Sequence, residues 1–291
     1  MKVILDTDIG DDIDDAWALA FLISHQDFEP LGVTIAHGNT PARAPIACKM
    51  LYLAGRSYIP VVLGRKTGNS VSYQYTWAED FEKVKPVRTD VASFLVEMAR
   101  RYPGEVTLIA VGPLQNVADA LRIEPQLGKY LKRVVLMSGC VYGTATDPAK
   151  PVPEYNVYAS TIDSQLVYGA GLPLAIVPLD STTRVQLAEE EREQVRKYDS
   201  PLTHAIEALY RLWIASPRSR MTLHDQLAVA EAARPGAFFG KKETLGIVVD
   251  DQGFTRLDPA KGKPVVVCLE PKRDDILRYY ISELTSQRLG K

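Results

Sequence analysis

The sequence predicts a single α/β domain with a mostly parallel central sheet covered by helices. Short apolar runs alternate with helical patterns along most of the chain, as in folds built from parallel strands and crossover helices. The apolar runs are continuous, which is typical of strands buried on both faces. No Pro/Gly/Ser linker, low-complexity tract or fixed-period repeat interrupts the 291 residues. We therefore expect one domain over residues 1–291.

The first five strand–helix alternations can be assigned in order, and a sixth strand follows them. Gly55 and the Pro103–Gly104 pair mark the ends of two of the helices. The expected strands are 2–6, 31–37, 59–64, 105–112, 131–139 and 172–180. The expected helices are 14–24, 44–55, 91–102, 114–122 and 160–171. After residue 180 we expect mostly helix, with a hairpin at 246–257 and a strand at 263–270.

Polar residues follow several of these strands directly. They are Asp6 and Asp8, then residues 37–39, 111–113 and 138–139. In a parallel sheet the carboxyl ends of the strands form one edge, and ligands bind beyond it. The sequence therefore predicts a polar site at this edge.

Composition and charge exclude several classes of function. The net charge is −2 and the basic residues are scattered, so no nucleic-acid footprint is present. Residues 189–197 mix both signs, as a solvated helix face does. No apolar run reaches the length of a membrane span, and the N-terminal stretch lacks a signal-peptide core. We expect a cytoplasmic protein with no nucleic-acid or membrane partner, and with Cys48, Cys140 and Cys268 as buried thiols.

Six aspartates lie within ten residues directly after the first apolar run. A helix start explains some of them, because carboxylates cap helices and interact favourably with the helix dipole. It does not explain Asp6 and Asp8 at a strand end. An EF-hand fails, because the twelfth residue from either of these is Trp17 or Leu19 instead of Glu. A hard cation that takes oxygen ligands explains the cluster, which comprises Asp6, Asp8, Asp11, Asp12, Asp14 and Asp15.

A phosphatase of the haloacid-dehalogenase type is an alternative explanation for Asp6 and Asp8. In that class the first aspartate of a DxD strand end is the nucleophile and the second is an acid, with Mg²⁺ as cofactor. The pattern requires Thr or Val two residues after the second aspartate, where this chain has Gly10. We keep this activity as the alternative from a different class of enzyme.

Five stretches together resemble the nucleoside hydrolase family, of the inosine–uridine-preferring type. In chain order they are DTDIGDDIDDAWAL (6–19), AHGNT (36–40), AVGPLQNVADAL (110–121), PEYN (153–156) and LHDQLAVA (223–230). The first and last are specific, and the order of all five strengthens the match. The resemblance runs from the N-terminus to about Ala233.

The resemblance implies roles for individual residues. Calcium ligands would be Asp8, Asp15, Asp225 and the backbone carbonyl of Val111. Ribose hydroxyls would be bound by Asp14 and Asn39, the 5′ side of the sugar by Glu154 and Asn156, and the underside of the ribose by Met137. The partner would be a free ribonucleoside, and the assembly a homodimer or homotetramer.

The implied reaction is calcium-dependent hydrolysis of the N-glycosidic bond, giving free base and ribose. A metal-bound water activated by Asp8 would attack an oxocarbenium-like ribosyl centre. His224, which precedes Asp225, would bind substrate and protonate the departing base. A protein that binds nucleoside and metal without turnover is the non-enzymatic alternative.

The chain departs from the family pattern at two places. Asp11 and Asp12 make the metal loop two residues longer, and we assign Asp14 and Asp15 to the family's aspartate pair because Ala16 and a helical pattern follow them. The loop after the third strand lacks the family's histidine. Its aromatic residues either anchor the loop or stack on the base. In the second case Trp77 would lie on one face of the base and Trp213, from the helix before His224, on the other.

Overall fold

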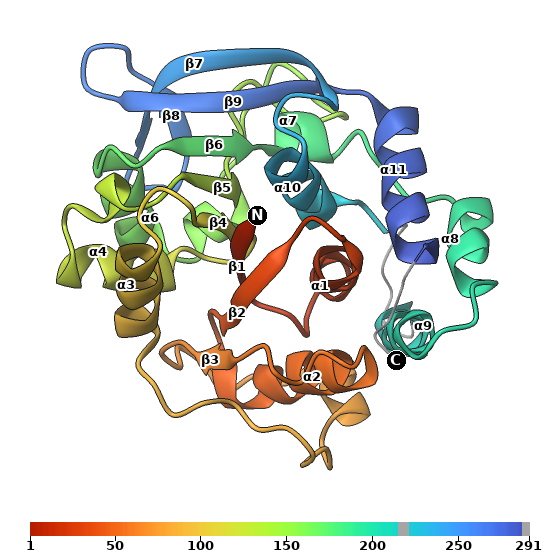
Figure 1. Cartoon of the computed structure of the whole chain (residues 1–291). Coiled ribbons are helices and arrows are strands. Elements are labelled where there is room, and N and C mark those ends of the chain that lie inside the picture. Colours follow the sequence, from red (N-terminus) through yellow and green to blue (C-terminus); the bar gives the residue numbers. More distant parts are fainter. Residues whose placement is uncertain (215–220, 287–291) are drawn as a thin grey trace.

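The computed structural model describes residues 1–214 and 221–286, which form a central sheet with helices on both faces (Figure 1). Nine strands of this part of the chain are ordered β3-β2-β1-β4-β5-β6-β9-β7-β8. Their bounds are β1 (Lys2–Thr7), β2 (Glu29–Ile35), β3 (Val61–Leu63), β4 (Thr107–Ala110), β5 (Arg133–Met137), β6 (Leu174–Val177), β7 (Phe239–Val249), β8 (Thr255–Leu257) and β9 (Lys263–Pro271).

The prediction of a mostly parallel sheet is confirmed. β1 lies between β2 and β4 and pairs with both in parallel, and β5, β6 and β9 continue the parallel order. β7 is antiparallel to both β8 and β9, so the expected hairpin is present at one edge of the sheet. Its first strand is longer than predicted, because residues 239–245 pair with β9 before the hairpin begins.

Helices cover the sheet on both faces (Figure 1). The α-helices are α1 (Asp14–Ser24), α2 (Thr40–Leu53), α3 (Val91–Arg101), α4 (Gln115–Ile123), α5 (Tyr155–Tyr158), α6 (Thr161–Gly169), α7 (Leu179–Thr182), α8 (Glu189–Arg196), α9 (Pro201–Ile214), α10 (His224–Ala233) and α11 (Arg273–Thr285). Two short 3₁₀ helices are η1 (Tyr73–Trp77) and η2 (Leu127–Lys129). α1 occupies the predicted residues, whereas α2 begins at Thr40, earlier than predicted, and contains Pro45 in its early turns.

The apolar residues of β1 divide between two cores. Val3 and Leu5 pack with α1, α2, α9, α10 and α11, whereas Ile4 packs with α3, α4 and α6 on the other face. This division follows from the two-residue period of a strand. It also explains why the run is continuously apolar, because neither face of β1 meets water.

The three cysteines are buried free thiols, as predicted. Among the described helices, none combines the length and the apolar character needed to cross a membrane.

The order of the strands determines where the polar edge lies. Asp8 follows β1, Val111 follows β4 and Met137 ends β5, and these strands are neighbours in the sheet. Their carboxyl ends therefore bring these three residues to one place.

Candidate active site

A cavity of about 440 Å³ opens at this edge of the sheet. Most residues around it are polar, and they come from loops after several different strands and from the start of two helices. The lining residues are Asp8, Asp11, Asp12, Asp14, Asp15, Val111, Met137, Glu154, Tyr155, Asn156, Leu179, His224 and Asp225.

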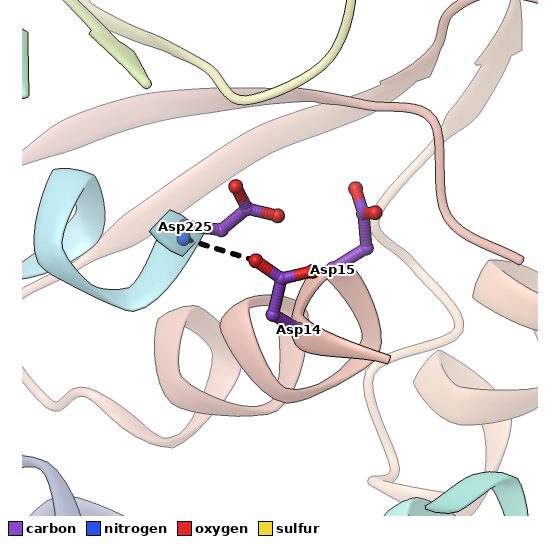
Figure 2. Close-up of side chains that lie close together, drawn as sticks. All are labelled: Asp14, Asp15 and Asp225. Atoms are coloured by element: carbon purple, nitrogen blue, oxygen red, sulfur yellow. Dashed lines mark hydrogen bonds between the residues drawn. The ribbon is translucent and has the colours of Figure 1, made fainter. Parts of the chain in front are cut away.

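Three buried carboxylates converge in this cavity (Figure 2). Asp14 and Asp15 open α1, and Asp225 lies in the first turn of α10, which packs against α1. One oxygen from each lies within 4.8 Å of the others, so the three can hold one metal ion. Helix N-termini favour negative charge, which explains how two helices can present acids to each other at this point.

Hydrogen bonds fix the orientation of these carboxylates. The Thr7 hydroxyl donates to Asp15, and the backbone N–H of Asp225 donates to Asp14 Oδ2 at 3.4 Å (Figure 2). The Gln226 amide donates to the backbone carbonyl of Asp14 at 2.8 Å, which ties α10 to the start of α1.

Burial raises the pKa of four carboxyl groups in the cavity. Burial first, and neighbouring aspartates second, raise the pKa of Asp14, Asp15 and Asp225 well above the ordinary value. Burial raises the pKa of Asp8 to about 6, although the Arg43 guanidinium acts in the opposite direction. Among the described residues, burial and like charge therefore outweigh the positive charge that Arg43 supplies to Asp8, which is the electrostatic condition of a cation site.

Gly112 allows the closest approach between the loops after β1 and β4. A Cβ atom at Gly112 would lie 2.7 Å from Asp8 Oδ1 and 2.9 Å from the Asp8 backbone nitrogen. A larger residue would displace the Asp8 side chain, which is the structural reason for a glycine directly after Val111.

Glu154 and Asn156 also line the cavity, and hydrogen bonds hold both side chains in place. Asn156 Nδ2 donates to the carbonyls of Val111, at 2.7 Å, and Met137, at 3.1 Å. The Glu154 carboxylate accepts N–H groups from Asn156 at 2.8 Å, Gly139 at 3.0 Å and Val157 at 3.2 Å, and so caps α5. Burial nevertheless raises the pKa of Glu154 to about 7.

His224 lies beside Asp225 in the lining of the cavity. Its Nδ1 is 2.7 Å from Thr182 Oγ1. Burial lowers the pKa of His224 to about 4, with Asp12 acting in the opposite direction, so the ring is neutral at pH 7.

Three residues predicted for substrate binding lie outside the lining of the cavity. Asn39 precedes α2, and its amide donates to the Asn69 carbonyl at 3.4 Å. Trp77 lies under Lys49, whose Nζ is 4.2 Å from the centroid of its ring. Trp213 is buried on α9, 5.6 Å between ring centroids from Tyr210.

Sequence reasoning missed two residues that line the cavity and one that supports it. Tyr155 stands between the predicted Glu154 and Asn156, and its hydroxyl is 3.2 Å from His37 Nε2. Leu179 follows β6, which ends at Val177, whereas the expected strand ran to residue 180 and so included it. Arg43 is buried on α2 beneath the aspartates, and no local pattern distinguishes it from other basic residues.

A family model described as inosine-uridine preferring nucleoside hydrolase matches residues 3–276. The chain belongs to this family. It is accordingly a ribonucleoside N-ribohydrolase by enzyme class, and the phosphatase alternative is wrong. The family is metal-dependent, and the buried aspartates can hold a metal ion.

Named relatives cover most of the nucleoside hydrolase chain. Uridine nucleosidase 1 of Arabidopsis thaliana is 27% identical, over 97% of this chain and 93% of that protein. The pyrimidine-specific ribonucleoside hydrolase RihA of Shewanella sp. (strain MR-7) is 28% identical, over 90% of this chain and 88% of that protein.

Solved structures share the fold. The plant nucleoside hydrolase PpNRh1 is similar with a TM-score of 0.85 at 24% identity, covering 98% of this chain and 99% of that one. The purine-preferring ribonucleoside hydrolase from Gardnerella vaginalis is similar with a TM-score of 0.83 at 20% identity, covering 98% of both chains.

Proposed function

We propose that this nucleoside hydrolase uses Ca²⁺ to hydrolyse the N-glycosidic bond of ribonucleosides, giving free base and ribose. One observation carries the proposal: Asp8, Asp14, Asp15 and Asp225 are buried together in one cavity at the carboxyl ends of the strands. Four acids at this density are costly unless a cation or protons compensate them.

The donor set fits a hard cation. Asp8, Asp15, Asp225 and the Val111 carbonyl offer oxygen atoms only, and oxygen ligands in an irregular arrangement suit Ca²⁺. Zinc sites are built mainly from histidine and cysteine, and among the described residues that line the cavity His224 is the single one of those types. When bound, Ca²⁺ supplies Lewis-acid chemistry, lowering the pKa of a water and polarising the ribose hydroxyls.

The chain's own residues perform the remaining steps. Asp8 takes a proton from the attacking water, whose oxygen forms a bond to C1′ of the ribose. Asp14 binds ribose hydroxyls, and Met137 lies against the sugar. The C1′–N bond breaks with its electron pair on the base, and the carboxyl oxygens of Glu154 stabilise the oxocarbenium-like centre.

The departing base needs a proton or a hydrogen bond. With the Thr182 hydroxyl donating to Nδ1, the neutral His224 ring carries its hydrogen on Nε2, which donates to the base. Tyr155, the aromatic residue in the lining, offers its ring for stacking in place of the expected tryptophans.

The substrate is a nucleoside without a phosphate. Asp11 and Asp12 add further acidic side chains to the lining, and a phosphate would meet them with like charge. Among the relatives described above, two are named for uridine or pyrimidine ribonucleosides. We therefore propose uridine as the first substrate to test.

The test is ribose release from a panel of purine and pyrimidine ribonucleosides, with Ca²⁺ and with a chelator. We expect release that stops on chelation and returns with Ca²⁺. 2′-Deoxynucleosides should react at least about 10²-fold more slowly, because a missing hydroxyl leaves buried polar groups unpaired. Tight nucleoside binding without ribose release would favour the non-catalytic alternative instead.

We also propose that the enzyme is a homodimer or homotetramer, as the family resemblance implies. A second proposal is that it is cytoplasmic. Light scattering on the purified protein and fractionation of the cells that produce it test these two statements. A monomer in solution would contradict the proposed homodimer or homotetramer.

A further inference from the structure

Side chains from other parts of the fold bind the backbone between β1 and α1. We call residues 8–13 the aspartate loop. Arg43 Nη1 donates to the carbonyls of Asp8 and Ile9, the latter at 3.1 Å. The Ser72 hydroxyl donates to the carbonyl of Gly10. Gln74 Nε2 donates to the next two carbonyls, those of Asp11 at 3.2 Å and Asp12 at 3.0 Å. Five successive carbonyls are thus bound by three side chains.

Arg43 also joins the aspartate loop to its neighbour. Its Nε donates to the His37 carbonyl at 3.0 Å, in the loop after β2, and its Nη2 pairs with the Asp11 carboxylate. Arg43 is only 2% exposed, and its hydrogen bonds to the carbonyls of Asp8 and Ile9 are buried, whereas the Asp11 side chain is 43% exposed. Buried charge-assisted hydrogen bonds of this kind are strong and directional.

Gln74 shows a conflict between stability and this role. It is 1% exposed, and its Oε1 has no hydrogen-bond partner among the described residues. An unpaired buried oxygen costs stability, so an apolar side chain of the same size would suit folding better. The amide N–H₂, with its two loop carbonyls, gives a reason for a glutamine at this position.

The residue next to Gln74 packs against the same loop. Gly10 has a φ of +124°, and a Cβ atom there would lie 2.5 Å from the ring of Tyr75. The loop therefore has contacts with η1 through both its carbonyls and its glycine.

We propose that Arg43, Ser72 and Gln74, which we call the carbonyl clamp, are positioning residues that hold the aspartate loop in the shape that binds the cation. This inference rests on the proposed function. The loop needs such support because Asp8, Asp11 and Asp12 all face one cavity and repel one another. It has no strand or helix ladder to resist that repulsion, and a binding site works when its supporting contacts are rigid.

The decisive variant is Gln74→Met, which keeps the size of the side chain and removes its hydrogen bonds. Calorimetry with Ca²⁺ should show an affinity about 10-fold weaker, the lower end for loss of a residue that orients ligands. The melting temperature of the metal-free protein should change little, because loss of the unpaired oxygen offsets the loss of a donor by the carbonyls of Asp11 and Asp12. Thr76→Ala is the matched control, because its hydroxyl bonds to Tyr73 within η1.

Amide exchange, combined with the calcium affinities, separates this proposal from the proposed function. Amide exchange of residues 9–13 in metal-free protein should be faster in Gln74→Met and Ser72→Ala than in Thr76→Ala. If the unmodified protein binds Ca²⁺ and Gln74→Met binds it equally well, the clamp proposal is overturned. If the unmodified protein binds no Ca²⁺, the proposed function loses its cofactor, and unchanged exchange in both variants overturns the clamp as well.

Discussion

Helix α10 carries two buried acids that the protein treats in opposite ways. Glu231, near its C-terminal end, is 0% exposed and pairs with Arg133 and with Lys242 at 2.8 Å. Asp225, in the first turn, is 3% exposed and faces Asp14 and Asp15. The helix dipole disfavours a carboxylate at the end near Glu231 and favours one at the start.

The difference teaches how to distinguish a structural acid from a ligand-binding one. Where the fold needs a buried carboxylate for its own stability, cations of the chain compensate it. Where the carboxylates serve a ligand, that compensation is withheld, and burial raises the pKa of Asp225 well above its ordinary value. Burial alone does not separate the two cases, whereas the nature of the neighbours does.

The largest effect expected is the loss of both metal and activity in Asp15→Ala and Asp225→Ala. Each variant removes a ligand and leaves the remaining carboxylates facing one another. Metal analysis and ribose release should both fall to background. Asp12→Asn should retain the metal. If it loses calcium as completely as Asp15→Asn does, the aspartate pair has been misassigned.

The second variant tests His224, the neutral residue that lies beside Asp225. His224→Ala should lower kcat by roughly 10²–10⁴-fold and change KM less, because donation to the base matters most in the transition state. p-Nitrophenyl riboside, whose leaving group needs no proton, should slow little. Equal losses on both substrates would show that His224 positions the ribose or Asp225 instead.

Substitution of Glu231, the acid that pairs with cations of the chain, should lower stability and leave activity unchanged. Glu231→Gln leaves the charges of Arg133 and Lys242 without their partner, at a cost of about 3 kcal/mol in the free energy of unfolding. That is the low end for a buried pair, because these two side chains are 18% and 29% exposed. Denaturant unfolding measures the loss, and kcat of the folded protein should not change. A fall in kcat without a loss of stability would mean that Glu231 is not a purely structural acid.

The local sequence was sufficient to predict the elements and motifs that neighbouring residues determine. α1 occupies the predicted residues because its acidic start and apolar continuation are both local features. The rule about strand ends placed Asp8 and Val111 on one edge, the family resemblance added Met137, and all three line one cavity. The family order of the motifs supplied Asp225, which no local pattern connects with Asp15.

The remaining features depend on contacts that a local pattern does not encode. An aromatic residue in a loop has no preferred direction, and Trp77 stacks under Lys49 outside the cavity lining. The oxygens of Glu154 were expected to face the sugar, yet they also cap α5. Arg43 reaches carbonyls far away in the sequence, so only the fold reveals it.

The smallest effect expected is a pH dependence of the metal-free enzyme's stability. Burial raises the pKa of Asp6 and Glu154 to about 7, and that of Asp225 well above its ordinary value. At pH 6.5 the carboxyl groups of Asp6 and Glu154 still hold protons in the folded state, and they lose most of these protons by pH 8. In the unfolded state the same groups hold almost no protons at either pH. The free energy of unfolding therefore falls as pH rises, by about 1–2 kcal/mol.

Calcium should oppose this trend, since it binds the deprotonated carboxylates of Asp8, Asp15 and Asp225. The rise in melting temperature that Ca²⁺ produces should therefore be larger at pH 8 than at pH 6.5. Thermal unfolding at the two pH values, with and without the ion, measures both slopes. Glu154→Gln serves as the control, because it removes one of the two groups whose pKa is about 7 and should flatten the metal-free slope. A metal-free melting temperature that rises towards pH 8 would mean that positive charges of the chain compensate the cluster after all.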